Sequence, residues 1–187
     1  MAGLVLCGGR SSRMGRDKAL IEIEGELLVR RVARLLAEAA SPVLLAPGRP
    51  GRLGELGMAE VADECPDSGP LGGIVAGLAA SPSRLLAVVA VDMPLASPAV
   101  FRLLASLHRG EDAVVPVTSS GPQPLHAVYS VGALGALRAR LMEGDLRLGH
   151  ALARLRVREA LEEEWAVADP TGRFAFNLNA EGDHSAL

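Results

Sequence analysis

The sequence predicts a single α/β domain over residues 1–187, with a mostly parallel central sheet and helices on both of its faces. Short apolar runs alternate along the chain with segments of helical periodicity, as in repeated strand–helix–strand units. The run Leu85–Val91 is apolar throughout and lies between Arg84 and Asp92, which is typical of a strand buried on both faces of a parallel sheet. Of the residues 49% are hydrophobic but only 3% are aromatic, so we expect a core of leucine, valine and alanine.

The alternation of elements can be followed in order along the chain. Apolar runs predict strands over residues 3–7, 43–45, 58–62, 85–91, 112–117 and 125–131. Helical spacing or small-residue composition predicts helices over residues 28–40, 71–80, 98–108, 132–142 and 148–156, and the pattern weakens over residues 157–167. Glycine- and proline-rich stretches at 47–54 and 118–124 are only loop-sized, so no domain boundary is expected.

Composition excludes several classes of protein. A net charge of −3 argues against a nucleic-acid partner, although a local basic patch could still bind a small anion. Cys7 and Cys65 are too few and too far apart for a Cys-x-x-Cys metal or redox site; we expect reduced thiols, and a bridge between them stays open. The first apolar run is too short for a signal peptide or a membrane span, which predicts a soluble cytoplasmic protein without a membrane partner.

The first predicted strand leads directly into a glycine-rich basic segment. The strand end and the glycine pair after it are Leu6, Cys7, Gly8 and Gly9. Glycines let a backbone approach a ligand closely, and the cations Arg13 and Lys18 can neutralise phosphate oxygens, so this segment predicts a phosphate-binding loop. Its spacing matches neither the P-loop nor G-x-G-x-x-G. The alternative is a surface loop with fortuitous basic residues.

Glycines and carboxylates also follow two other apolar runs, where ligands gather in parallel sheets. Asp63 follows residues 58–62 and precedes a glycine-containing segment with Gly69, Pro70, Leu71 and Gly73. Asp92 ends the buried run 85–91, and its carboxylate could hold Mg²⁺ together with phosphate oxygens. Asp63 could instead be an ordinary turn carboxylate. Asp92 could instead be a helix cap or a turn residue, but Ser97 is a better cap for the next helix.

The segment Leu6–Lys18 resembles the signature L-x-G-G-x-S-x-R-M-G-x-D-K of nucleotidyltransferases, most closely that of the molybdenum cofactor guanylyltransferases. The resemblance extends from residue 3 to about residue 180, through V-D-M-P at 91–94, G-P-L-G-G at 69–73, Q-P-L-H-A-V-Y at 123–129 and F-N-L-N at 176–179. It implies a three-layer, Rossmann-like nucleotidyltransferase fold.

The resemblance also implies roles for individual residues. Arg13, Lys18 and Asp92 would be catalytic, and Asp92 would bind Mg²⁺. Nucleotide contacts would come from Leu6, Cys7, Gly8, Gly9, Lys18, Asp63, Gly69, Pro70, Leu71, Gly73 and Asp92. Asn177 and Asn179 would lie on the pterin side, where their amides could both donate and accept hydrogen bonds. The alternative for that pair is an edge strand followed by a helix capped by Asn179.

The activity implied is transfer of GMP from Mg²⁺-GTP to the terminal phosphate of molybdopterin, with or without molybdenum, releasing pyrophosphate. Molybdoenzymes or cofactor-biosynthesis proteins are possible partners. Ala46 stands where many members of the family have a nucleotide-contacting asparagine, so CTP stays open as the donor. Two further interpretations stay open, namely transfer to a sugar or alditol phosphate and a nucleotide-binding module without catalysis.

One basic region has no role in any of these motifs. It comprises Arg138, Arg140, Arg147, Arg154, Arg156 and Arg158. A solvated helical face is the simpler interpretation, and docking of an anionic cofactor or an acidic protein is the alternative.

Overall fold

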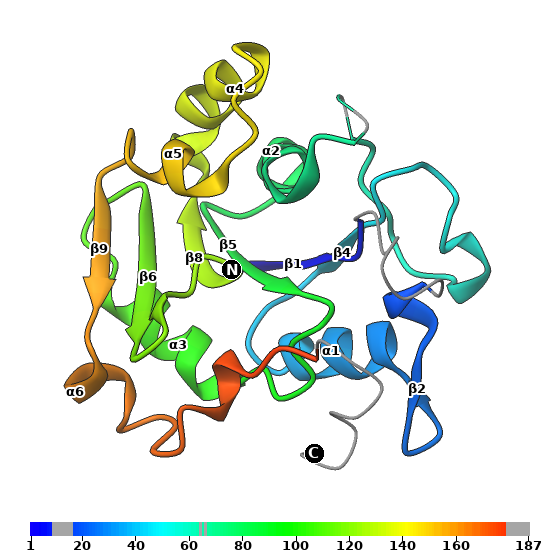
Figure 1. Cartoon of the computed structure of the whole chain (residues 1–187), viewed down its shortest axis with the longest axis horizontal. Helices are drawn as coiled ribbons and strands as arrows, with labels where there is room; N and C mark the ends of the chain where they lie inside the picture. The colour runs from blue at the N-terminus through cyan, green and yellow to red at the C-terminus, as the bar shows by residue number, and fades with distance from the viewer. Residues whose placement is uncertain (9–16, 64, 66, 179–187) are drawn as a thin grey trace.

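The structure, a computed structural model, describes residues 1–8, 17–63, 65 and 67–178, and within these ranges seven strands form one sheet (Figure 1). The strands are β1 (Ala2–Leu6), β4 (Val43–Ala46), β5 (Leu85–Ala90), β6 (Ala113–Thr118), β7 (Gly121–Pro122), β8 (His126–Ser130) and β9 (Val157–Ala160). The helices are α1 (Leu28–Ala37), α2 (Gly69–Ala80), α3 (Pro98–Leu107), α4 (Leu134–Met142), α5 (Leu148–Leu152) and α6 (Glu162–Trp165). A separate hairpin consists of β2 (Glu22–Ile23) and β3 (Glu26–Leu27).

The sheet is mostly parallel, as the sequence predicts. Its strand order is β4-β1-β5-β8-β6-β7, and β9 pairs with β6. β4, β1 and β5 pair in parallel, and β9 is parallel to β6, whereas β8 is antiparallel to both β5 and β6. The carboxyl ends of β4, β1 and β5 therefore meet at one edge, where a ligand can reach all three.

Helices cover both faces of the sheet, which confirms the three-layer architecture (Figure 1). Alternate residues of β1 point to opposite faces. Val5 packs in one core cluster with residues of α1 and α3, whereas Leu4 and Leu6 pack in the other with residues of α2 and α4. The continuous apolar run of β5 has the same cause, because both of its faces are covered.

Helix α2 lies unusually close to β1. A Cβ atom at Gly73 would lie 2.7 Å from Leu6 Cδ2, and one at Gly77 would lie 2.9 Å from Leu4 Cδ1, so glycine permits this approach. The first residues of α2 are thereby placed beside the carboxyl end of β1.

Three sequence predictions are wrong in detail. Residues 58–62 do not form a strand; Glu60 makes only an isolated bridge to Leu45. The helix predicted over 148–156 ends at Leu152, because residues 157–160 form strand β9. The helix predicted over 28–40 ends at Ala37. Among the described residues, no helix is long and apolar enough to cross a membrane.

Candidate active site

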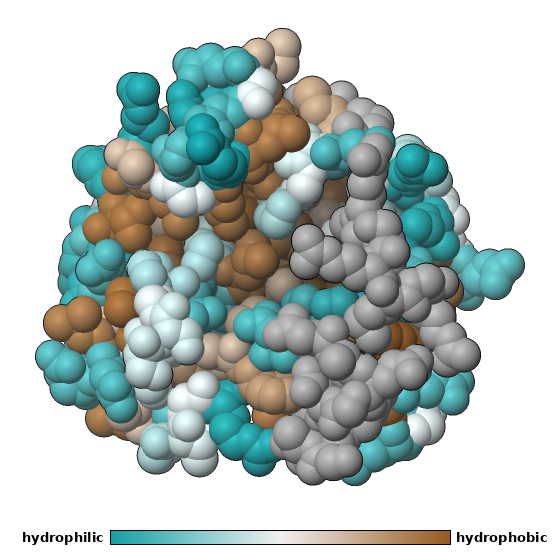
Figure 2. Space-filling view, viewed as in Figure 1, coloured by the Kyte–Doolittle hydropathy of each residue, from teal (hydrophilic) through white to brown (hydrophobic). Residues whose placement is uncertain are grey.

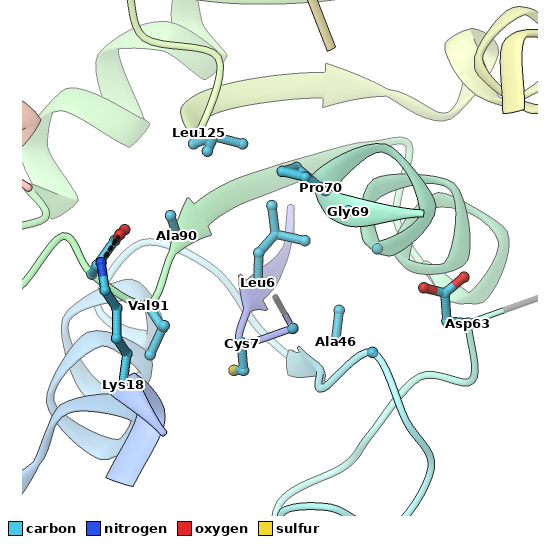
Figure 3. A pocket seen from close by; sticks show the side chains of 14 residues that line it. Leu6, Cys7, Lys18, Ala46, Asp63, Gly69, Pro70, Ala90, Val91 and Leu125 are labelled. Carbon is cyan, nitrogen blue, oxygen red and sulfur yellow. Dashed lines mark hydrogen bonds and ion pairs between the residues drawn. The ribbon is translucent and has the colours of Figure 1, made fainter. Parts of the chain in front are cut away.

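A pocket of about 250 Å³ opens at the carboxyl ends of β1, β4 and β5, beside the start of α2 (Figure 3). It is lined by Leu6, Cys7, Gly8, Lys18, Ala46, Gly48, Asp63, Gly69, Pro70, Gly73, Ala90, Val91, Asp92 and Leu125. Lys18 and Asp63 lie at opposite sides of it, with Leu6, Cys7 and Ala46 between them (Figure 3). In the space-filling view, hydrophobic surface occupies the centre of this face, between hydrophilic residues above and below (Figure 2).

One side of the pocket carries an ion pair between Lys18 and Asp92. Lys18 opens a short 3₁₀ helix, η1 (Lys18–Leu20), which Asp17 caps by accepting a hydrogen bond from the Ala19 N–H at 3.0 Å. Asp92 follows β5. Lys18 Nζ lies 3.0 Å from Asp92 Oδ2, and the two side chains are only 23% and 25% exposed. A cation and an anion from distant parts of the sequence thus meet in the wall of one pocket.

The C-terminal segment is hydrogen-bonded to the same pair. Lys18 Nζ donates to the Leu178 carbonyl at 3.0 Å, and the Leu178 N–H donates to the Asp92 carbonyl at 2.8 Å. Asn177 lies next to this contact, and its side-chain amide donates to the Ala175 carbonyl at 3.1 Å. Residues 176–178 belong to no helix or strand. The segment predicted to face the acceptor is therefore adjacent to the residues predicted to face the nucleotide.

The opposite side of the pocket is a turn packed against α2. Asp63 accepts a hydrogen bond from the Cys65 N–H at 3.0 Å, and the Ser68 hydroxyl donates to its other oxygen at 3.5 Å. A Cβ atom at Gly72 would lie 2.9 Å from Asp63 Oδ1, so this glycine lets the carboxylate sit against the helix. Asp63 is thus part of an ordered turn as well as a pocket wall, and the two interpretations given for it are compatible.

The helix-cap interpretation of Asp92 is wrong, because Ser97 caps α3. Its hydroxyl oxygen accepts a hydrogen bond from the Val100 N–H at 3.3 Å, as the sequence predicts for this residue. The pocket also lacks a reactive thiolate at Cys7. Burial raises the pKa of the Cys7 thiol from 9.0 to about 12, so this thiol stays protonated near neutral pH.

A multi-ligand metal centre is not found in the part of the chain that the structure describes. No three Asp, Glu, His or Cys side chains there lie close enough to hold a metal ion together. Asp92 offers a single carboxylate, a donor set that suits Mg²⁺ when phosphates supply the other oxygens.

Most of the residues predicted for the site line this pocket. They are Leu6, Cys7, Gly8, Lys18, Asp63, Gly69, Pro70, Gly73 and Asp92. Leu71 does not line it, since its side chain is fully buried in the core. Gly9, Arg13 and Asn179 lie outside the described residues.

Gly48, Leu125 and Arg52 are among the residues of this region that were not assigned to the site from the sequence, although Leu125 lies in the segment 123–129 that resembles the family. Gly48 and Leu125 line the pocket, and Arg52 contacts the ends of two segments that border it. Gly48 has a φ of +78°, a backbone conformation that favours glycine. The glycine itself, in a Gly/Pro-rich loop, was therefore the signal that the sequence offered for this position. Ala46 lies in the pocket wall, where its methyl side chain has no donor or acceptor for a hydrogen bond.

The arginines of residues 138–158 mostly pair within the molecule. Arg140 bonds both Glu143 and Asp145, and Arg147 lies 3.2 Å from Asp145. Arg156 and Arg158 pair with Asp112 and Glu164. These contacts favour a solvated, internally paired face over a docking site.

A glycine-lined pocket at the carboxyl ends of a doubly wound sheet defines a Rossmann-like nucleotide-binding protein. The profile of the MobA-like NTP transferase domain matches residues 3–161, so the chain belongs to the MobA-like nucleotidyltransferases and is an enzyme of that class.

Individual relatives cover nearly the whole chain. It is 38% identical to the "probable molybdenum cofactor guanylyltransferase" of Chloroflexus aggregans, over 98% of this chain and 91% of that protein. It is 40% identical to the "molybdenum cofactor guanylyltransferase" of Xanthomonas euvesicatoria, over 80% and 78% of the two chains. The crystal structure of molybdopterin-guanine dinucleotide biosynthesis protein A from Archaeoglobus fulgidus superposes with a TM-score of 0.85 at 24% identity, over 100% of this chain and 96% of that one, which shows the shared fold.

Proposed function

We propose that this enzyme transfers GMP from GTP to the terminal phosphate of molybdopterin, forming the guanine dinucleotide of the cofactor and pyrophosphate. The observation that carries the proposal is the Lys18–Asp92 pair at the carboxyl ends of β1 and β5, in a chain whose relatives are named molybdenum cofactor guanylyltransferases. In the reaction, an oxygen of the acceptor phosphate bonds to the α-phosphorus of GTP. The bond from that phosphorus to the pyrophosphate oxygen breaks, and the electron pair leaves with pyrophosphate.

Charge stabilisation is the main contribution that we assign to the side chains. Negative charge grows on the leaving pyrophosphate, so fixed cations near it lower the barrier. We assign this role to the ammonium of Lys18 and to Arg13. Asp92 would hold Mg²⁺, which when bound neutralises phosphate charge. For the ammonium to reach the phosphates, Lys18 would exchange its Asp92 partner for phosphate oxygens.

A general base is not required of the protein. The nucleophile is a phosphate monoester, which is ionised near neutral pH before it reacts. His126 belongs to the segment 123–129 that resembles the family, but it is fully buried and is not among the residues lining the pocket. Burial lowers its pKa to about 3, so it is neutral at physiological pH.

We assign the acceptor to the side of the pocket where the C-terminal segment contacts Lys18 and Asp92. Asn177 and Asn179 would bind the polar edge of the pterin, because an amide can match both its donors and its acceptors. The contact of Leu178 with Lys18 supports placing this segment next to the phosphates. Delivery of the product to molybdoenzymes and a cytoplasmic location remain predictions.

Pyrophosphate release with a panel of nucleotides and acceptors tests the proposal. We expect release with GTP, Mg²⁺ and molybdopterin, and none when the acceptor is omitted. Release with CTP but not GTP would support the cytidylyltransferase alternative that Ala46 leaves open. Release with a sugar phosphate in place of molybdopterin would reassign the acceptor. Binding of GTP without turnover of any acceptor would favour a nucleotide-binding module.

A further inference from the structure

Arg52 connects three segments around the pocket, although it does not line the pocket itself. Its Nε donates to the Pro47 carbonyl at 2.9 Å, and its Nη2 donates to the Cys7 carbonyl at 2.5 Å. Its Nη1 bonds the Asp17 carboxylate. One planar guanidinium thus joins the end of β1, the loop after β4 and the residue before η1. Its rigid fork of donors suits such a three-way contact better than a lysine would.

The backbone of Arg52 is fixed on both sides by one carboxylate. Glu60 accepts hydrogen bonds from the Gly51 N–H at 2.7 Å and from the Leu53 N–H at 2.8 Å. Glu60 in turn pairs with Leu45 of β4 through an isolated β-bridge. The guanidinium is therefore held from the central sheet, and Arg52 is only partly exposed, at 26% of its side chain.

Asp17 transmits this restraint to Lys18. One carboxylate oxygen of Asp17 bonds Arg52, while the other accepts the hydrogen bond from the Ala19 N–H that caps η1. Lys18 lies between Asp17 and Ala19, and Ala19 is fully buried. If the carboxylate of Asp17 moved, the cap would move with it, and so would the direction in which the Lys18 ammonium points.

We propose that Arg52 is a positioning residue, which fixes the Lys18 ammonium for the nucleotide phosphates by holding Asp17. The inference rests on the function proposed above, since it assumes that Lys18 binds those phosphates. A displacement of about 1 Å at a reacting group can cost on the order of 10²-fold in rate, so the effect of losing this restraint is measurable.

Calorimetric titration of Mg²⁺-GTP, without acceptor, tests the proposal most directly. We expect Arg52→Gln to weaken GTP binding by about tenfold and to lower kcat in the full reaction by about 10- to 100-fold, because Lys18 acts on both bound substrate and transition state. Asp17→Asn, which weakens the ion pair but leaves Arg52 its two carbonyl contacts, should have an effect in the same direction. Arg52→Lys should recover part of the loss.

Arg49→Gln is the matched control. It removes the same charge from the same loop, but Arg49 is 75% exposed and its nearest ion-pair oxygen, on Asp67, is 3.9 Å away. GTP binding and kcat should stay within about twofold of the wild type for this variant.

A double-mutant cycle separates positioning from general loss of structure. In the Lys18→Ala background, Arg52→Gln should change GTP affinity by less than about threefold, because the group that it positions is gone. Equal effects of Arg52→Gln on GTP affinity in both backgrounds would overturn the proposal. So would a GTP affinity of Arg52→Gln within about twofold of the wild type. If Arg52→Gln does not fold, the same result for Asp17→Asn would overturn it. A wild type that binds GTP but releases no pyrophosphate with any acceptor would overturn the function proposed above, while the binding data would still decide the role of Arg52.

Discussion

Lys18 is the residue at which the pocket and the C-terminal segment meet. Its ammonium bonds the carboxylate of Asp92 and the carbonyl of Leu178, residues that are 74 and 160 positions away in sequence. An ammonium has three donors, so the one that now bonds Asp92 can pass to a new oxygen while the contact with Leu178 is kept. A phosphate oxygen is the partner that we expect when a nucleotide is bound.

Asp92→Asn tests the metal-binding role that we propose for the partner of Lys18. The amide keeps the shape of the carboxylate but removes its charge, so we expect turnover to fall by about 10²-fold or more through lost metal positioning. The loss of a partly exposed ion pair should cost at most about 1 kcal/mol in unfolding free energy. Steady-state kinetics over a range of Mg²⁺ concentrations, with urea unfolding, measure both quantities.

Glu24→Gln is the control for this variant. It removes a carboxylate that is 75% exposed from an ion pair with Arg31, away from the pocket. Its turnover should match that of the wild type. Normal turnover of Asp92→Asn at saturating Mg²⁺ would remove Asp92 from the proposed metal site.

Among the elements, α2 depends most on small side chains. Glycine lowers helix propensity by about 1 kcal/mol relative to alanine, yet Gly72, Gly73 and Gly77 all lie within this helix. Each faces another group that a Cβ atom would contact. The helix gives up intrinsic stability, and in exchange it lies close enough to β1 to place Gly69 and Pro70 in the pocket wall.

Gly77→Ala should therefore destabilise the protein, although alanine favours a helix. The new methyl group would lie 2.9 Å from Leu4 Cδ1, and Leu4 is fully buried. Overpacking costs about 1–3 kcal/mol, which exceeds the gain in propensity. Gly135→Ala in α4 is the control, because nothing lies within 4 Å of its Cβ position.

The control variant should be more stable than the wild type by up to about 1 kcal/mol. Urea unfolding of the two variants shows whether each substitution lowers or raises the unfolding free energy. A stabilised Gly77→Ala variant would show that α2 can move away from β1 at little cost.

At the scale of the whole molecule, His126 joins parts of the fold that are far apart in sequence. It lies on β8, and its ring stacks on that of Phe101 of α3, with 3.9 Å between the ring centroids. Its centroid lies 4.8 Å from that of Phe174, near the end of the described chain. Its Nε2 accepts a hydrogen bond from the Ser97 N–H at 3.1 Å. This arrangement requires the neutral imidazole, because a protonated Nε2 could not accept.

Acid should therefore weaken the whole fold through this histidine. Its pKa is about 3 in the folded protein and near the ordinary 6.5 in the unfolded chain. The unfolded state thus binds a proton first as the pH falls, so this contribution to stability is complete above pH 6.5 and is lost progressively below it. Between pH 7.5 and 5.0 the loss amounts to about 2 kcal/mol.

His126→Gln keeps an acceptor for the Ser97 N–H and has no titrating group. Unfolding free energies of the variant and the wild type at pH 7.5 and 5.0 isolate this contribution. We expect the difference between the two proteins to shrink at the lower pH. Parallel pH dependence in both proteins would mean that the imidazole is protonated without cost.

Sequence patterns determined much of this protein because their physical causes are local. A continuous apolar run predicts a doubly covered strand, as in β5, and Gly8, the glycine after the first strand, was predicted for the site and lines the pocket. Ser97 could be assigned as a cap because its hydroxyl reaches a backbone N–H only three residues ahead. Lys18 and Asp92 follow two such strands, and strand ends of a parallel sheet meet at one edge.

Only the tertiary structure decided the features that depend on distant contacts. Residues 58–62 have an apolar pattern, but the Glu60 carboxylate bonds the turn around Arg52, and only Glu60 pairs with β4. The sequence does not distinguish Arg52 from an ordinary loop arginine, because its partners Cys7 and Asp17 are 45 and 35 residues away along the chain. Hydrogen-bond partners at such separations are set by how the sheet brings loops together, and no local preference of the chain encodes them.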